Sequence, residues 1–389
     1  MIPQTKDFRV HGWLIHEDTS IQKVDLSVID GRISFLPSDK PYLFETPVYI
    51  LPGLVDSHTH VDYPQELVSP AQRESFVRKN LMQMSKAGTL LLRDLGASSQ
   101  TLSTLPTHPQ EPQRIHSGRA MIGCRNACFS AISAEDVIST ASKQSAQGLS
   151  WVKIFADWPH PSIQDDSKAT YFRADNPLTY PADVLKETVA AAHREGARVA
   201  AHAFTLHGAR ACIDANVDSI EHGWGITLDM IPELIEKNIA WVPLLSLSEG
   251  MKQMALRDDR PDQIQWVEAC WEHLGHVLPE ASKRGVRILG GTDWFPAVTL
   301  ATEVQHMIER GMTPTRAVMS ISTAARSFLG YPIIEEGAPA DICLFHDDPR
   351  AVPSRLCEPD WICVSGVPLQ PERPQIPTPP KNPHHHLAS

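Results

Sequence analysis

The chain has 389 residues, of which 42% are hydrophobic and 21% are charged, and its formal net charge is -11 at pH 7. This composition is ordinary for a globular protein and excludes a fibrous or wholly disordered chain. Lysine and arginine are dispersed along an acidic sequence, which argues against a nucleic-acid partner because phosphate binding needs clustered basic residues. The length suffices for one large barrel with a small accessory domain.

The sequence indicates neither a membrane-spanning segment nor a secretory signal peptide. The apolar stretches are too short to cross a bilayer, and the first residues lack the basic start and apolar run of a secretory signal. The seven cysteines form an odd set without the paired spacings of a disulfide framework, and the close pair Cys124 and Cys128 has no accompanying histidines. We therefore expect a cytoplasmic protein with free thiols and no membrane partner.

The two ends of the chain have β character. Residues 1–48 consist of short β-rich runs, and Asp30-Gly31 between two of them predicts a hairpin. Strand character returns within residues 329–367, so we expect both ends to combine into a small β-sandwich domain. Residues 368–389 are rich in proline and polar residues and are predicted to form a flexible tail, whose His384-His385-His386 indicates a solvated segment or a vector remnant.

Residues 49–328 alternate short β runs with helical stretches, such as the 3.6-residue periodicity of Pro181 to Glu195. This alternation and this length are typical of an α/β fold, specifically a (β/α)₈ TIM barrel. The eight predicted strands are Ile50–Val55, Thr89–Leu95, Arg114–Ile122, Trp151–Phe155, Arg198–His202, Ser219–His222, Ala240–Leu244 and Val286–Gly291.

Metal-binding residue types follow several of these strands. His58 and His60 lie two residues apart at the end of the first strand, so their imidazoles should project to the same side at the carboxyl end of the barrel. His202 and His222 end two further β runs, and Asp293 follows the last one. One histidine alone could be a packed side chain, and an isolated Thr-Asp could cap a helix. Together they favour a metal centre.

Lys153 lies in an apolar β run, Trp-Val-Lys-Ile-Phe, where burial of an unpaired ammonium is costly. A lysine snorkelling from a strand end would be the alternative. A buried functional lysine can react with CO₂ to give a carbamate, which is an anionic ligand able to bridge two cations. Imidazole and carboxylate ligands suit Zn²⁺, with Mn²⁺, Co²⁺ or Fe²⁺ as alternatives.

The sequence resembles the amidohydrolase superfamily, in particular its imidazolonepropionase-like and Xaa-Pro or Xaa-Arg dipeptidase-like enzymes. The resemblance extends over nearly the whole chain except the tail. Its motifs are Leu51–His60, Leu90–Gly96, Trp151–Phe155, Ala201-His202-Ala203, Ile220–Gly223, Gly290–Asp293 and Gly337–Ile342.

This resemblance implies a binuclear metal-dependent hydrolase. His58, His60 and Asp293 would hold a more buried ion, His202 and His222 a more exposed one, and N6-carboxylysine at Lys153 would bridge the two. A hydroxide shared by the ions would be the nucleophile, and Asp293 would act as general acid and base. The substrate would be a small molecule with an amide, cyclic amide or related C–N bond.

The substrate pocket departs from the resemblance. Dipeptidase-like relatives commonly carry a Gly-Gly-His-type loop after the third strand, whereas residues 121–129 of this chain have a different sequence that includes Arg125. Trp158, Trp224 and Trp294 follow the metal-binding strands and are predicted, with Arg125, to contact substrate. Packing of these tryptophans is the alternative.

Three other functions remain to be compared. A mononuclear deaminase of the same superfamily typically has a glutamate three residues after the fifth-strand histidine, where this chain has Thr205. A carboxylic or carbamate ester hydrolase needs the same hydrolytic residues, and a non-catalytic barrel scaffold would be expected to have lost them. The sequence leaves the substrate and the oligomeric state open, a homo-oligomer included.

Overall fold

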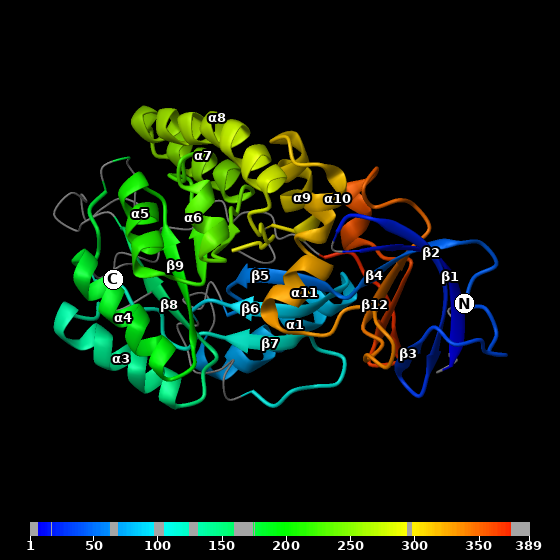
Figure 1. Ribbon diagram of the computed structural model, residues 1–389. Coiled ribbons are helices and arrows are strands. Elements are labelled where there is room, and N and C mark those ends of the chain that lie inside the picture. Colours follow the sequence, from blue (N-terminus) through cyan, green and yellow to red (C-terminus); the bar gives the residue numbers. More distant parts are fainter. Residues whose placement is uncertain are drawn as a thin grey trace.

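The computed structural model describes residues 7–16, 18–62, 69–96, 105–123, 131–158, 174, 176–293 and 298–374. Within these ranges the strands form one seven-stranded mixed sheet and two parallel sheets of four and three strands. Helices accompany the parallel strands, and the mixed sheet lies at the opposite side of the molecule from α3 and α4 (Figure 1). The predicted α/β class with parallel sheets is confirmed.

The mixed sheet joins the two ends of the chain, as expected. Its order is β14-β13-β12-β4-β1-β2-β3, and the amino-terminal and carboxyl-terminal strands lie side by side in Figure 1. The core between these strands includes Phe8 and Trp361, whose rings meet edge to face with centroids 4.7 Å apart. A second facing layer, which a sandwich would need, stays a prediction. The strands are β1 (Phe8–Ile15), β2 (Ile21–Ile29), β3 (Arg32–Ser34), β4 (Val48–Pro52), β12 (Ile342–Phe345), β13 (Trp361–Val364) and β14 (Val367–Leu369).

The predicted hairpin at Asp30-Gly31 is confirmed. Ile29 of β2 pairs with Arg32 of β3, so Asp30 and Gly31 alone form the turn. Their φ angles are 50° and 76°, the left-handed values that a two-residue turn of this kind requires at both positions.

The carboxyl-terminal strand extends beyond the point where the tail was predicted to begin. Strand β14 includes Pro368 and Leu369, and Glu372 accepts a 2.8 Å hydrogen bond from the Lys86 ammonium. Residues 375–389, with His384-His385-His386, lie outside the described residues.

The parallel sheets contain seven strands that match seven of the predicted runs, with one change at the start. The predicted first strand, Ile50–Val55, is divided at Gly53 into β4 of the mixed sheet and β5 of the parallel sheet. A Cβ at Gly53 would lie 2.6 Å from the Leu90 side chain, so the close approach of β6 requires glycine there. The sheets comprise β5 (Leu54–Thr59), β6 (Thr89–Asp94) and β7 (Gln113–His116), then β8 (Trp151–Phe155), β9 (Arg198–Ala203), β10 (Ser219–His222) and β11 (Ala240–Val242).

Single backbone contacts connect the edges of these two parallel sheets. Met121 forms a parallel bridge to Ile154 of β8, shortly after β7 in the chain. At the other edge Trp241 of β11 bridges to Ile288. The amide of Ser57 in β5 then donates a 3.0 Å hydrogen bond to the Gly290 carbonyl. The predicted eighth strand, Val286–Gly291, is thus represented by isolated contacts and not by a regular strand.

The helices pack apolar faces onto the strands, and α4 matches the helix predicted from the periodicity of residues 181–195. Threonine hydroxyls cap the amino termini of α5 and α9. Among the described residues, no helix combines the length and apolar character needed to cross a membrane. The α-helices are α1 (Arg73–Lys86), α3 (Ala134–Ala146), α4 (Ala182–Arg194), α5 (Leu206–Ala215), α6 (Ile231–Glu236), α7 (Leu247–Arg257), α8 (Pro261–Arg284), α9 (Leu300–Glu309), α10 (Pro314–Met319) and α11 (Thr323–Leu329), with short 3₁₀ helices η2 (Pro70–Gln72) and η4 (Pro353–Cys357).

Candidate metal centre

Three of the predicted ligands meet at one point. The Nε2 atoms of His58 and His60 lie 3.2 Å and 3.3 Å from the same oxygen, Oδ1 of Asp293. Their potential ligand atoms all lie within 4.8 Å of one another. Two imidazole nitrogens and a carboxylate oxygen at such spacing can surround one divalent cation.

The backbone around Asp293 brings it to His58. The amide of Asp293 donates a 2.7 Å hydrogen bond to the His58 carbonyl. Asp293 has φ 58° and His222 has φ 66°, the left-handed region that non-glycine residues rarely adopt. Such conformations cost about 1 to 3 kcal/mol each and persist where surrounding contacts impose them, commonly at functional sites. Two of the six predicted ligands therefore have strained backbones.

The two remaining histidines continue the cluster. The ring centroids of His58 and His222 are 5.7 Å apart, and those of His222 and His202 are 4.5 Å apart. Phenylalanine rings stack on both: Phe155 on His202 at 4.6 Å and Phe204 on His222 at 4.2 Å. The structure thus brings all four predicted imidazoles into one continuous group.

Lys153 of β8 is buried beside this group. Its side chain is 1% exposed, and within the described part of the chain its Nζ has no hydrogen-bond partner. Burial lowers the pKa of Lys153 to about 8, although the negative charges of Glu221 and Asp293 oppose the shift. A buried amine without an acceptor fits a residue that is completed by a further group, such as CO₂ or a metal ion.

The protonation states favour metal binding. Burial lowers the pKa of His222 to about 3, and it lowers the pKa of His202 well below its ordinary value, assisted by the charges of neighbouring histidines and Lys153. Burial alone would raise the pKa of Asp293, but the adjacent histidines hold it well below its usual range. At neutral pH His202 and His222 are therefore neutral and the Asp293 carboxylate is ionised, which are the ligating forms. The Nδ1 atom of His222 is also buried with no hydrogen-bond partner among the described residues. The imidazole and carboxylate donors, together with the buried Nδ1 of His222 and Nζ of Lys153, therefore fit a metal centre.

Sequence reasoning missed a buried carboxylate that joins the first and last ligands. Asp56 accepts hydrogen bonds from the Thr292 hydroxyl at 2.7 Å, the Thr292 amide at 3.0 Å and the His58 amide at 3.3 Å. Burial raises the pKa of Asp56 to about 7, against the effect of these donors. Its position inside a fully buried strand is the signal that could have identified it.

A second missed group lies beneath His58. Glu221 and Arg93 are fully buried, and their Oε1 and Nη2 atoms are 3.0 Å apart. The other oxygen of Glu221 lies 2.9 Å from His58 Nδ1. Burial would raise the pKa of Glu221, but Arg93 and His58 hold it well below its usual range. The available signals were an arginine directly after the apolar run Leu90–Leu92 and a glutamate directly before the predicted ligand His222.

The predicted substrate contacts are only partly described. Trp158 is half-buried, and its ring centroid is 5.2 Å from that of His202, so its role as a pocket wall stays a prediction. Trp224 is 1% exposed and donates its indole hydrogen to the Pro243 carbonyl at 2.8 Å, so it packs behind Phe204 and presents no open face. Arg125 and Trp294, like Cys124 and Cys128, lie outside the described residues.

Thr205 has a structural role in this arrangement. Its hydroxyl donates a 2.7 Å hydrogen bond to Asp157 and accepts a 2.9 Å hydrogen bond from the Gly208 amide at the start of α5. Asp157 also accepts from the Phe204 and Thr205 amides. Thr205 therefore fixes the segment after β9 and caps the next helix.

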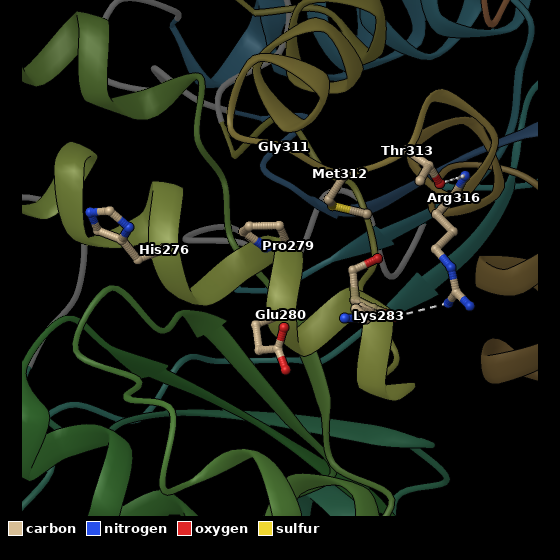
Figure 2. Close-up of a pocket in the computed structure, with 9 residues that line it drawn as sticks. His276, Pro279, Glu280, Lys283, Gly311, Met312, Thr313 and Arg316 are labelled. Atoms are coloured by element: carbon tan, nitrogen blue, oxygen red, sulfur yellow. Dashed lines mark hydrogen bonds between the residues drawn. The ribbon is translucent and has the colours of Figure 1, made fainter.

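A surface hollow of about 330 Å³ lies away from these residues, between α8 and the segment 311–316. Figure 2 shows His276, Pro279, Glu280 and Lys283 of α8 facing Met312 and Arg316 across it. The Arg316 guanidinium already donates to the Ser282 carbonyl at 2.9 Å. None of the candidate ligands lines this hollow, so the metal cluster remains the candidate functional site.

Comparison with known proteins agrees with the motifs. Residues 49–365 match the amidohydrolase family, so the chain belongs to that family. An uncharacterised protein of Mycobacterium tuberculosis is 31% identical over 382 residues, which cover 94% of this chain and 96% of that protein.

Solved structures show the same fold. A Xaa-Pro dipeptidase with methionine bound in its active site has a TM-score of 0.76 at 21% identity, covering 93% of this chain and 99% of its own. The ochratoxinase of Aspergillus niger has a TM-score of 0.73 at 21% identity, covering 93% of this chain and 95% of its own. The predicted family is thereby confirmed, and the dipeptidase shares the fold of this chain.

Proposed function

We propose that this chain is a metal-dependent hydrolase that cleaves an amide, a cyclic amide or a related C–N bond. The observation that carries the proposal is the convergence of His58, His60 and Asp293 on one point, beside two further histidines and a buried lysine. Membership of the amidohydrolase family and the fold of a dipeptidase agree with it.

The scaffold that we propose is one closed (β/α)₈ barrel made from the two parallel sheets. The bridges of Met121 to Ile154 and Trp241 to Ile288 support closure, because they connect both edges of the sheets. His58, His60, His202 and His222 then lie at or near the carboxyl ends of β5, β9 and β10, where barrel enzymes have their active sites, and Lys153 lies two residues before the end of β8.

Two divalent ions, with zinc as the first candidate, would be held by these residues. His58, His60 and Asp293 would bind one ion, His202 and His222 the other, and Lys153 as N6-carboxylysine would bind both. Among the described residues, Nζ of Lys153 and Nδ1 of His222 have no hydrogen-bond partner, which supports this assignment because a bound group would remove the cost of leaving them buried.

Asp293 would transfer the proton. When bound, divalent ions lower the pKa of a coordinated water and polarise the scissile carbonyl. Oδ1 of Asp293 faces the two histidines, which leaves Oδ2 to accept the proton of the attacking water and return it to the leaving nitrogen. The aromatic side chains Phe155, Phe204 and Trp158 would exclude bulk water from one side of the reaction.

Deamination fits these residues less well. Thr205 stands where a superfamily deaminase typically has a proton-donating glutamate, and its hydroxyl is already engaged with Asp157 and Gly208. We therefore favour a hydrolytic reaction on an acyl carbon. The name of the Xaa-Pro dipeptidase points to dipeptides as the first substrates to be tested.

Metal analysis and a substrate screen test the proposal. The purified protein should contain close to two equivalents of zinc or manganese. It should hydrolyse members of an amide and lactam library, and Asp293→Asn should be inactive. His276→Asn, on the exposed surface of α8, is the control for loss of a histidine. Absence of bound metal, or full turnover after chelation, would overturn the proposal, and activity on esters alone would redirect it to an ester hydrolase.

A further inference from the structure

Beneath His58, the Glu221 carboxylate contacts three polar groups in a fully buried space. Its Oε2 atom lies 2.9 Å from His58 Nδ1. Its Oε1 atom accepts hydrogen bonds from Arg93 Nη2 at 3.0 Å and from the Ser219 hydroxyl at 2.5 Å. Glu221 and Arg93 are both 0% exposed. An ion pair of this kind stabilises little by itself, because desolvation offsets its attraction, so its presence beside the candidate metal centre calls for another explanation.

Arg93 contacts the backbone next to His58 directly and contacts the His58 ring through Glu221. Its Nε donates at 2.7 Å to the carbonyl of Ser57, the residue before His58, and its Nη1 donates at 3.0 Å to the Ser219 hydroxyl. The flat face of the guanidinium lies over the Trp151 ring, 4.3 Å from its centroid. Every edge of Arg93 is therefore engaged, which fixes the carboxylate of Glu221 in one place.

His58 lies between two carboxylates. Nδ1 faces Glu221 and Nε2 faces Asp293 at 3.2 Å. A neutral imidazole carries one N–H, so it can donate to only one of them and can bind a cation only through the other nitrogen. Nε2 of His58 and Nε2 of His60 lie near the same oxygen of Asp293, so a cation bound by all three residues is on the Nε2 side of His58. The hydrogen of the His58 ring is then on Nδ1.

We propose that Glu221 is a positioning residue of the metal centre, whose carboxylate, held by Arg93 and Ser219, keeps His58 as the Nδ1–H tautomer with Nε2 directed at the cation. This inference rests on the proposed function, since it assigns a role toward the ion held by His58, His60 and Asp293. Both carboxylate oxygens of Glu221 are engaged by His58, Arg93 and Ser219, so we assign Glu221 no direct contact with the ion or the substrate. Its effect reaches the reaction only through His58.

Zinc affinity of designed variants tests the role. Glu221→Gln should bind the first equivalent of zinc about 10- to 100-fold more weakly, the effect typical of losing such a partner. Glu303→Gln is the matched control, because Glu303 is equally buried and hydrogen-bonded but contacts Leu245 and Ser246 instead of a ligand. The control should bind zinc within about twofold of the unaltered protein.

A double variant separates positioning from simple charge balance. Arg93→Met together with Glu221→Leu removes both buried charges, which proteins often tolerate. The double variant should have a melting temperature close to that of the unaltered protein. Its first zinc equivalent should nevertheless bind as weakly as in Glu221→Gln. Zinc affinity equal to that of the unaltered protein would show that Glu221 only neutralises Arg93, and this inference would be overturned while the proposed function stood.

The unaltered protein supplies a readout that does not depend on the folding of variants. In zinc-loaded protein with ¹⁵N-labelled histidine, the His58 signal should show a protonated Nδ1 and a metal-bound Nε2. A metal-bound Nδ1 would refute the inference even if the enzyme were active. A protein that binds no zinc at all would overturn the proposed function and this inference with it.

Discussion

His58 and His222 are neighbours in the candidate metal centre, with ring centroids 5.7 Å apart, but different kinds of group hold their rings. A buried carboxylate, Glu221, contacts His58 at 2.9 Å. Stacking with Phe204 at 4.2 Å holds His222, whose Nδ1 has no hydrogen-bond partner among the described residues. A hydrogen bond selects a tautomer and raises ligand basicity, whereas a stacked ring fixes only a plane.

This difference divides the centre into two halves. The His58 half, with His60 and Asp293, already has its ligand atoms within 4.8 Å of one another. The His222 half has aromatic packing around its imidazoles, and it would also need Lys153, whose amine would first have to be modified to become the proposed anionic ligand. We expect the first half to bind its ion more tightly.

Asp293→Asn removes the residue on which the first half converges. We expect turnover to fall by about 10²- to 10⁴-fold, because a general acid and base and an anionic ligand are lost together. Steady-state hydrolysis with saturating zinc measures the effect, and His276→Asn should remain fully active beside it. Turnover near that of the unaltered enzyme would exclude Asp293 from proton transfer.

Removal of metal should destabilise the fold as well as stop the reaction. An ion present at about 1,000 times its dissociation constant stabilises the folded state by about 4 kcal/mol, provided that the unfolded chain does not bind it. Calorimetry before and after chelation measures this loss. Returned zinc should bind in two steps of different affinity, and two equal steps would contradict the division into halves.

Glu303 sharpens the comparison because it is a buried carboxylate without an arginine. It accepts hydrogen bonds from Leu245 and from Ser246, and burial raises its pKa to about 7 from 4.5. The folded protein therefore holds a proton that the unfolded chain releases, so this contribution to stability is complete below pH 4.5 and is lost as the pH rises to 7. The loss is about 3 kcal/mol for such a shift.

Urea denaturation across this pH range tests the effect of Glu303. Relative to Glu303→Gln, the unaltered protein should lose free energy of unfolding between pH 4.5 and 7. A constant difference between the two proteins over that range would show that the carboxyl group does not titrate there.

Phe204→Leu should have the smallest effect, and it addresses only the His222 half. Loss of an aromatic stack is worth about 0.5 to 1.5 kcal/mol, so the second zinc equivalent should bind about 2- to 10-fold more weakly while the first is unchanged. Phe328→Leu is the control, because it removes a buried ring that lies tilted against Trp151 with centroids 5.9 Å apart. Equal weakening of both equivalents would mean that Phe204 supports the whole centre.

Local pattern in the sequence was sufficient to predict the ligands. Each is a polar residue at or near the carboxyl end of an apolar run, and parallel strands bring such ends together. The Asp30-Gly31 hairpin was predictable for a similar reason, because a two-residue turn has a strong local signature.

Tertiary pairing was not predictable in the same way. Glu221 and Arg93 are 128 residues apart in the chain, and neither strand alone indicates the other as its partner. The eighth strand failed to form as predicted because Gly290 and Gly291 pack directly against Ile321 and His58, where a Cβ would lie 2.3 Å and 2.8 Å from their atoms. That close packing replaces regular strand pairing with single backbone contacts.

Gly53 connects a strand of the mixed sheet, β4, directly to β5, which carries His58. The order in which the chain is synthesised therefore affects when this part of the site can form. Strand β4 lies in the mixed sheet between β1 and β12, and Ile50 pairs with Leu344 from the far end of the chain. Only Gly53 separates this strand from β5, which carries His58. A chain shortened to begin at residue 49 would lose β1 and leave an unpaired, aggregation-prone edge. During translation, β4 gains its partner β12 only after residue 345 has been synthesised, so we expect the proposed first ion to bind late.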